Sequence, residues 1–145
     1  MKVVVQRVTK ARVTVQDKLH SEIGNGMVIL LGVKKGDTEQ QARKLAERCS
    51  HVRIFEDSGG KFNLSIKDIQ GEALVVSQFT LLADTSRGRR PSFTNAEDPH
   101  VAETIYERFI SALKALGVPT KSGRFGERMV VSLDNQGPVT IIMEE

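Results

Sequence analysis

Short runs of apolar and β-branched residues alternate with polar breaks along most of the chain, a pattern typical of strands. We expect strands at residues 2–8, 11–16, 27–33, 52–55, 73–79, 129–133 and 139–143. The first two are separated by a short polar break and predict a hairpin. The third and the fifth are nearly continuous apolar runs, which predicts that those two strands are buried.

Two segments carry apolar residues at helical spacing instead. The first begins near Asp37, which we expect to cap the helix with Gln40 as its reciprocal partner. Cys49 falls on the apolar positions of this helix and should therefore be buried. The second segment runs from Pro99 to Leu116 and ends at the glycine that follows, because glycine favours the conformation that closes a helix.

The order of these elements predicts an α+β fold, with a compact mixed or antiparallel, barrel-like sheet and two main helices. No repeat, low-complexity tract or linker interrupts the sequence, so we expect a single domain over residues 1–145. A strand-rich chain of this size leaves sheet edges exposed, and pairing with a second copy would cover one of them.

Composition is that of an ordinary globular protein, with 39% hydrophobic and 27% charged residues. The single cysteine, Cys49, excludes an internal disulfide and fits a reducing compartment. The chain opens on a strand pattern without the layout of a signal peptide, and no apolar run approaches a membrane span. We therefore expect a cytoplasmic protein that does not enter a membrane.

Two polar segments differ from the strands around them. The segment Ser77–Leu81 ends an apolar strand with hydroxyl and amide groups, and Gly137–Pro138 separates two strand-like runs. Proline has no N–H for a ladder, and X–Pro bonds are the ones that take the cis form at low cost. A tight turn is the ordinary interpretation of such a dipeptide.

Familiar catalytic machinery is missing from the sequence. None of the three histidines lies near a serine or cysteine in a known motif, and there is no nucleophile elbow. Cys49 is expected to be a core residue and not a nucleophile. No His or Cys pair has ligand spacing, so we expect no metal and no cofactor. The glycines at 24–26 and 59–60 lack the ending of a phosphate loop and should form hairpin turns.

The net charge of +3 is too small to establish a nucleic-acid partner, but its distribution is informative. Basic residues cluster in the two loops that flank the polar segments. They are Arg87, Arg89 and Arg90 after the first segment, and Lys121, Arg124 and Arg128 before the second. Such loops suit a substrate with phosphates, although a solvated surface explains them equally well.

Five stretches of the chain together resemble the D-aminoacyl-tRNA deacylases, the enzymes that remove D-amino acids from tRNA. They are residues 1–8, 26–33, 77–81 with the trailing 89–91, 123–126 and 137–140. Their order and spacing make the resemblance specific, and it runs along nearly the whole chain.

The resemblance implies roles for individual residues. The catalytic segment would be Ser77, Gln78, Phe79 and Thr80. The substrate pocket and chiral filter would be Arg7, Phe125, Met129, Gly137 and Pro138, and the tRNA contacts Arg87, Arg89 and Arg90. It also implies a homodimer in which a cis Gly137–Pro138 bond reaches the active site of the other subunit.

Hydrolysis of an aminoacyl-tRNA ester needs little from side chains, because the ester is already activated. Backbone N–H groups at the end of residues 77–81 can stabilise the oxyanion. Thr80 has no visible base, so we expect Thr80 and Ser77 to position substrate or water while the tRNA 2′-hydroxyl assists the attack.

The chiral filter would work by exclusion. Carbonyls at Gly137–Pro138 would hold the substrate ammonium so that an L side chain meets backbone, whereas a D side chain or glycine passes. Arg7 would hold this loop if buried, although alternation alone equally allows a solvent-facing arginine.

Three other functions remain open. A non-catalytic RNA-binding protein would bind tRNA in a salt-sensitive way without cleaving it, although we expect no exposed aromatic platform in this chain. A hydrolase of small D-amino-acid esters would cleave free esters as well as charged tRNA. A purely structural dimer would leave the polar end of the strand at residues 73–79 unexplained.

Overall fold

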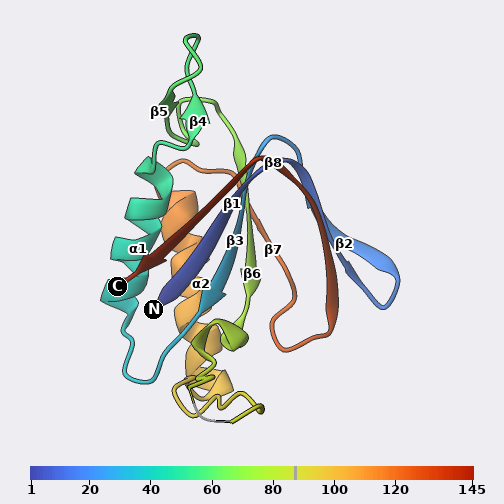
Figure 1. Cartoon of the computed structure of the whole chain (residues 1–145), viewed down its shortest axis with the longest axis vertical. Coiled ribbons are helices and arrows are strands. Elements are labelled where there is room, and N and C mark those ends of the chain that lie inside the picture. Colours follow the sequence, from blue (N-terminus) through green and yellow to red (C-terminus); the bar gives the residue numbers. More distant parts are fainter. Residues whose placement is uncertain (87) are drawn as a thin grey trace.

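The computed structural model describes residues 1–86 and 88–145. The chain forms a mixed sheet, two α-helices, a short 3₁₀-helix (η1) and a small separate hairpin (Figure 1). The elements are β1 (Lys2–Val15), β2 (Lys18–Ile23), β3 (Gly26–Gly32), α1 (Glu39–His51), β4 (Phe55–Glu56), β5 (Phe62–Leu64), β6 (Glu72–Ser77), η1 (Phe79–Leu82), α2 (Pro99–Ala115), β7 (Thr120–Ser122) and β8 (Met129–Glu144). The predicted combination of two main helices with a mixed sheet is confirmed.

The sheet is built on β1. The first half of β1 pairs antiparallel with β3 and the second half with β2, while β8 runs antiparallel along both halves. β3 then pairs parallel with β6, and β6 with β7. In Figure 1 the far halves of β1 and β8 turn away from the helices together with β2, which gives the sheet its barrel-like curl.

The hairpin predicted within residues 2–16 is wrong. The polar break at Thr9 and Lys10 is not a turn, because β1 continues through it and exchanges β3 for β2 there. The chain turns later, at Gln16 and Asp17, whose φ angles of 50° and 60° match a tight hairpin connection.

Other strand predictions also change. Residues 24–26 are not a hairpin turn, because they link β2 to β3 along the same edge of β1 in one register, with Ile23 opposite Ala11 and Gly26 opposite Val8. Most of residues 52–55 precede a strand, since β4 begins only at Phe55. The runs 129–133 and 139–143 are two halves of β8, because both pair with β1.

The sheet separates two hydrophobic cores. The main core lies between the sheet and the two helices, and it contains Leu45, Phe109 and the fully buried Cys49, as predicted for the cysteine. The second is formed by residues of β1, β2, β3 and β6, with residues of β8 packed against it, and contains Val13 and Leu74. Within the described part of the chain, no helix combines the length and apolarity needed to cross a membrane.

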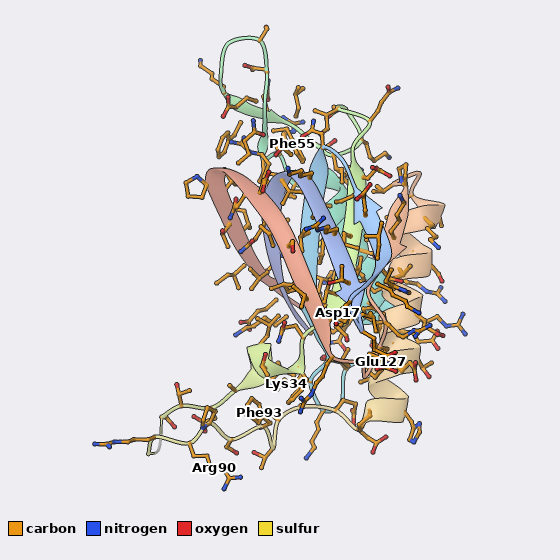
Figure 2. The ribbon with its side chains drawn as sticks, turned by 90° about the vertical axis from the view of Figure 1, so that its right-hand side faces the viewer. Asp17, Lys34, Phe55, Arg90, Phe93 and Glu127 are labelled. Carbon is orange, nitrogen blue, oxygen red and sulfur yellow. The ribbon has the colours of Figure 1, made fainter. Side chains whose placement is uncertain are left out.

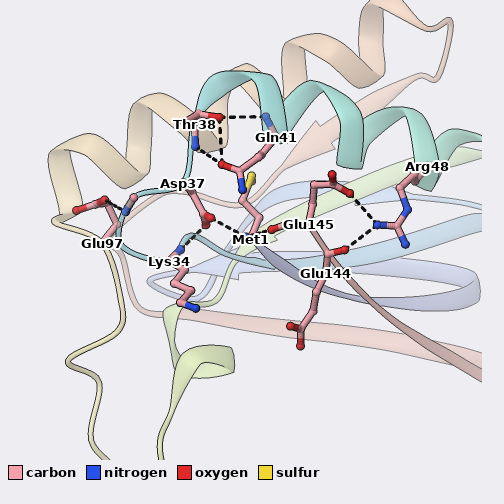
Figure 3. A network of polar contacts seen from close by, with 10 residues as sticks. Met1, Lys34, Asp37, Thr38, Gln41, Arg48, Glu97, Glu144 and Glu145 are labelled. Atoms are coloured by element: carbon pink, nitrogen blue, oxygen red, sulfur yellow. Dashed lines mark hydrogen bonds and ion pairs between the residues drawn. The ribbon is translucent and has the colours of Figure 1, made fainter.

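α1 is capped by Thr38, one residue later than predicted. The Thr38 hydroxyl accepts a hydrogen bond from the Gln41 N–H, and the Gln41 side chain accepts one from the Thr38 N–H at 2.8 Å. Asp37 is engaged elsewhere, since its carboxylate accepts hydrogen bonds from the Met1 ammonium at 2.8 Å and the Lys34 N–H at 2.6 Å (Figure 3). These contacts fasten the start of β1 to the turn that leads into α1.

Candidate functional site

A cavity of about 480 Å³ opens at the carboxyl end of β6, between η1, the start of α2 and the start of β8. Residues 73–76 of β6 are buried, so the half-buried, polar Ser77 marks the point where the strand emerges. The walls contain Ser77, Gln78 and Phe79 of the predicted catalytic segment, together with Phe125 and Met129 of the predicted substrate pocket. Residues far apart in the sequence are thus brought together here.

Thr80 directly follows these wall residues and is exposed. The Gln78 side-chain amide donates a hydrogen bond to Thr80 Oγ1, while the Gln78 N–H donates to the Leu31 carbonyl at 2.8 Å. The N–H groups of Phe79 and Thr80 open the short η1 helix, and neither donates a hydrogen bond among the described residues. Two neighbouring free N–H groups can stabilise a developing oxyanion.

Tyr106 is a wall residue that the sequence did not single out. Its hydroxyl donates to the Val75 carbonyl at 2.8 Å, and burial raises the pKa of Tyr106 well above its ordinary value, so the hydroxyl stays a donor. Its ring packs against Phe125 with 5.6 Å between centroids. Tyr106 is the only tyrosine of the chain and lies within a predicted amphipathic helix. Its position could have indicated a role at the site, because a buried tyrosine needs a hydrogen-bond partner for its hydroxyl.

Phe93 was also missed, because it lies in a loop without periodicity. Its ring meets Phe79 edge to face, with 5.1 Å between centroids, and the two residues are 37% and 56% exposed. The expectation that the chain lacks an exposed aromatic platform is therefore wrong. Such a pair offers an apolar surface to a ring or base beside the cavity.

Glu97 places a negative charge in the cavity wall. Its carboxylate accepts hydrogen bonds from the N–H groups of Asp98 at 2.9 Å and Gly36 at 3.0 Å. These bonds lower the pKa of Glu97, so the group is ionised at neutral pH and can attract an ammonium.

Gly137 and Pro138 lie at the opposite end of the sheet from this cavity. Their peptide bond is cis, and the bend that they make in β8 faces Arg7. Arg7 pairs with the amino-terminal part of β3, whereas Ser77 pairs with its carboxyl-terminal part. Figure 1 shows the bend of β8 and η1 at opposite ends of the sheet, so one copy of the chain does not bring these segments together.

Arg7 is buried, which excludes the solvent-facing alternative. Its Nε donates to the Gln136 carbonyl at 3.1 Å and its Nη1 to the Ile54 carbonyl at 2.9 Å. Both terminal nitrogens lie 3.3 Å from Glu56 Oε1. Arg7 is therefore hydrogen-bonded to Gln136, the residue just before Gly137.

The basic loop after η1 projects from the body of the molecule. Asp84 and Ser92 close it by exchanging two backbone hydrogen bonds of 2.8 and 2.9 Å. Arg89 and Arg90 are exposed within it, and Figure 2 shows Arg90 pointing away from the sheet. Arg87 lies outside the described residues.

The second basic cluster divides in the fold. Arg124 and Arg128 are exposed in the loop that carries Phe125. Lys121 Nζ instead donates to the Glu22 carbonyl at 2.7 Å, and Lys121 does not line the cavity. Arg124 and Arg128, which adjoin the wall residues Phe125 and Met129, are therefore the members of this cluster that lie beside the candidate site.

Metal ligands and the single cysteine can be assessed within residues 1–86 and 88–145. No group of three His, Cys, Asp or Glu residues there could hold a metal ion. Burial raises the pKa of the Cys49 thiol to about 12, which makes it inert near neutral pH.

Known proteins match the chain along nearly its full length. The model of the family described as D-Tyr-tRNA(Tyr) deacylase matches residues 4–144. Proteins named D-aminoacyl-tRNA deacylase from Roseiflexus sp. (strain RS-1) and Carboxydothermus hydrogenoformans are 54% and 53% identical over 144 residues. The matches cover 99% of this chain and 93% and 99% of those relatives. A solved structure named "c-Myc DNA Unwinding Element Binding Protein" has a TM-score of 0.95 at 41% identity, covering 100% of this chain and 99% of that one.

Proposed function

The chain belongs to the D-Tyr-tRNA(Tyr) deacylase family, and from this premise we propose how its residues hydrolyse the ester between a D-amino acid and tRNA. Membership of the family supports D-aminoacyl-tRNA deacylase activity, and the role of each residue in that activity is what we propose. The observation that carries it is the cavity wall at Phe79, where the N–H groups of Phe79 and the adjoining Thr80 donate no hydrogen bond among the described residues.

In this mechanism the ester carbonyl lies against these two N–H groups as negative charge develops on its oxygen. Oriented donors of this kind contribute roughly 10²–10³ in rate. Thr80 holds substrate or water, because its hydroxyl contacts the Gln78 amide and, among the described residues, no base. The neighbouring 2′-hydroxyl assists the attack, and water adds across the ester to release the D-amino acid and the tRNA.

Chirality is set by the Gly137–Pro138 segment of a second copy of the chain. Each copy holds this segment at the far end of the sheet from its own cavity, which supports a second copy as its source. Its backbone carbonyls accept hydrogen bonds from the substrate ammonium and fix the α-carbon. An L side chain then meets backbone, a D side chain points to solvent, and glycine passes because it has no side chain to exclude.

The acceptor end of the tRNA lies along the exposed loop that carries Arg89 and Arg90, with Arg87 assigned to the same surface on sequence alone. Contacts of arginine to phosphate position a nucleic acid without reading its sequence, which suits an enzyme that acts on many tRNAs. The same substrate places the enzyme in the cytoplasm, and the chemistry requires no metal.

Hydrolysis of D-tyrosyl-tRNA, L-tyrosyl-tRNA and glycyl-tRNA with a chelator present tests this proposal. We expect rapid cleavage of the D and glycyl substrates alone, and a Thr80→Ala variant that keeps most of its turnover. A loss of several orders of magnitude in that variant would instead make Thr80 the nucleophile.

Two results would favour a different function for this chain. Equal cleavage of a free D-tyrosine ester would favour a small-ester hydrolase. Retained salt-sensitive tRNA binding without any cleavage would favour a nucleic-acid-binding protein, which is how one solved relative is named.

A further inference from the structure

The guanidinium of Arg7 is held by a hairpin outside the main sheet. The side chain of Arg7 is 6% exposed, so its charge requires compensation from the protein. The Gln136 carbonyl comes from β8, but the Ile54 carbonyl and the Glu56 carboxylate come from the segment that enters and forms β4. Glu56 supplies the only carboxylate in contact with this guanidinium among the described residues.

Phe62 completes the enclosure. Arg7 Cζ lies 5.1 Å from the centroid of the Phe62 ring, within the range of an attractive cation–π contact. Phe62 is 52% exposed, so core packing does not account for its position. Glu56 and Phe62 are directly paired across β4 and β5, which places both side chains on the same face of the hairpin.

The hairpin itself is small and separate from the main sheet. Two-stranded hairpins of this length are marginal alone, so its geometry depends on its turn and on what it contacts. Asp57 organises the turn by accepting hydrogen bonds from the N–H groups of Gly59 at 2.8 Å and Lys61 at 3.1 Å. The turn at residues 57–60 thus presents the Glu56–Phe62 pair in a fixed position.

We propose that Glu56 and Phe62 are positioning residues that keep Arg7 on the Gln136 carbonyl and thereby set the chiral selectivity of the Gly137–Pro138 segment. This inference rests on the proposed function of that segment. The hairpin acts through Arg7 and touches neither the ester nor the N–H groups of Phe79 and Thr80. Its loss therefore changes which substrates are excluded more than how fast the preferred one is cleaved.

The test compares the ratio of kcat/KM for D-tyrosyl-tRNA to that for L-tyrosyl-tRNA in Glu56→Gln and Phe62→Leu. Hydrogen bonds to charged groups are worth about tenfold or more in an equilibrium constant, so we expect the ratio to fall about tenfold in Glu56→Gln. The contact of Phe62 with Arg7 is a cation–π interaction, worth about two- to fivefold at an exposed site, so we expect a fall of that size in Phe62→Leu. Phe62→Tyr keeps the ring face and should keep the ratio. Lys61→Ala is the matched control on the same hairpin, because the hydrogen bonds of Lys61 among the described residues run through its backbone to Asp57 and survive the substitution.

Structural damage alone would lower both rates together and leave the ratio unchanged. Thermal unfolding of each variant identifies such damage independently. An unchanged ratio in Glu56→Gln and Phe62→Leu, or an equal fall in Lys61→Ala, overturns the inference.

Arg7→Lys separates this inference from the function on which it rests, because lysine lacks the planar fork of donors. A ratio that falls in Arg7→Lys but not in the hairpin variants leaves the chiral role of Gly137–Pro138 intact and removes Glu56 and Phe62 from it. A wild-type enzyme that cleaves both enantiomers equally removes both proposals.

Discussion

Alanine in place of Gly137 would strain the bend of β8 in two separate ways. Gly137 has a φ of +124°, which side-chain-bearing residues rarely adopt. An added Cβ would also lie 2.8 Å from Val139 Cγ2 and 3.0 Å from Arg7 Nη2. Because the Arg7 guanidinium is enclosed on several sides, it cannot retreat without weakening its bond to the Gln136 carbonyl.

Each effect has a magnitude. A non-glycine residue in such a backbone conformation costs about 1–3 kcal/mol. A weakened hydrogen bond to a charged group adds about 1.5–3 kcal/mol, for a total of about 2.5–6 kcal/mol. For a chain of 145 residues, each kcal/mol lowers Tm by about 3 °C, so we expect a fall of about 8–18 °C.

Gly117→Ala is the matched control. Gly117 has a φ of +84° just after α2, and an added Cβ there meets nothing within 4 Å. Only the backbone term applies, about 1–2 kcal/mol or about 3–6 °C. The assay is thermal unfolding of both variants, followed by the D-to-L ratio of tyrosyl-tRNA hydrolysis, which should fall in Gly137→Ala alone. Equal shifts in Tm, or an unchanged ratio in Gly137→Ala, would refute the reasoning.

Two further predictions concern buried polar groups. Tyr106→Phe should lower the free energy of unfolding in urea by only about 1 kcal/mol, because the Gly123 N–H still donates to the Val75 carbonyl at 2.9 Å; a loss above about 3 kcal/mol would mean that this carbonyl is left unsatisfied. Cys49 should resist a thiol reagent at pH 8 until the protein unfolds, because burial raises its pKa to about 12, and rapid labelling of the native protein would contradict that burial. Since the Cys49 pKa is raised in the folded state, the thiol contributes stability that is complete below about pH 8.5, the ordinary thiol value, and declines as the pH rises towards 12.

The sequence predicted the helices better than the strands because helical spacing is a local signal. Cys49 was placed in the core by the spacing of its neighbours on one helix. The break at Thr9 and Lys10 was misread because the exchange of β3 for β2 along one strand is set by partners distant in sequence. Asp37 was misassigned for the same reason, since its partner Met1 is remote along the chain.

For the candidate site as well, features with a local sequence signal were predicted and features that depend on distant contacts were not. The cavity walls at Ser77 and Phe125 came from short motifs and meet in the fold. Phe93 could not be found, because its contact with Phe79 depends on the path of a long loop. Spacing also could not show that Gly137 lies at the other end of the sheet from the cavity, because that distance is a property of strand register.

The path of β1 through both cores has a consequence for how the protein opens. The first half of β1 pairs with β3 and the second half with β2, while β8 pairs with both halves. Opening either core therefore breaks hydrogen bonds between β1 and its neighbouring strands. Amide protons of β1 should therefore exchange with solvent deuterium at the rate of global unfolding, whereas those of the β4–β5 hairpin exchange by local fluctuation. The cavity wall at Met129 and the bend at Gly137 both belong to β8, which pairs with β1 along its length. The positions of the cavity and of the bend are therefore fixed relative to each other by one cooperatively folded pair of strands.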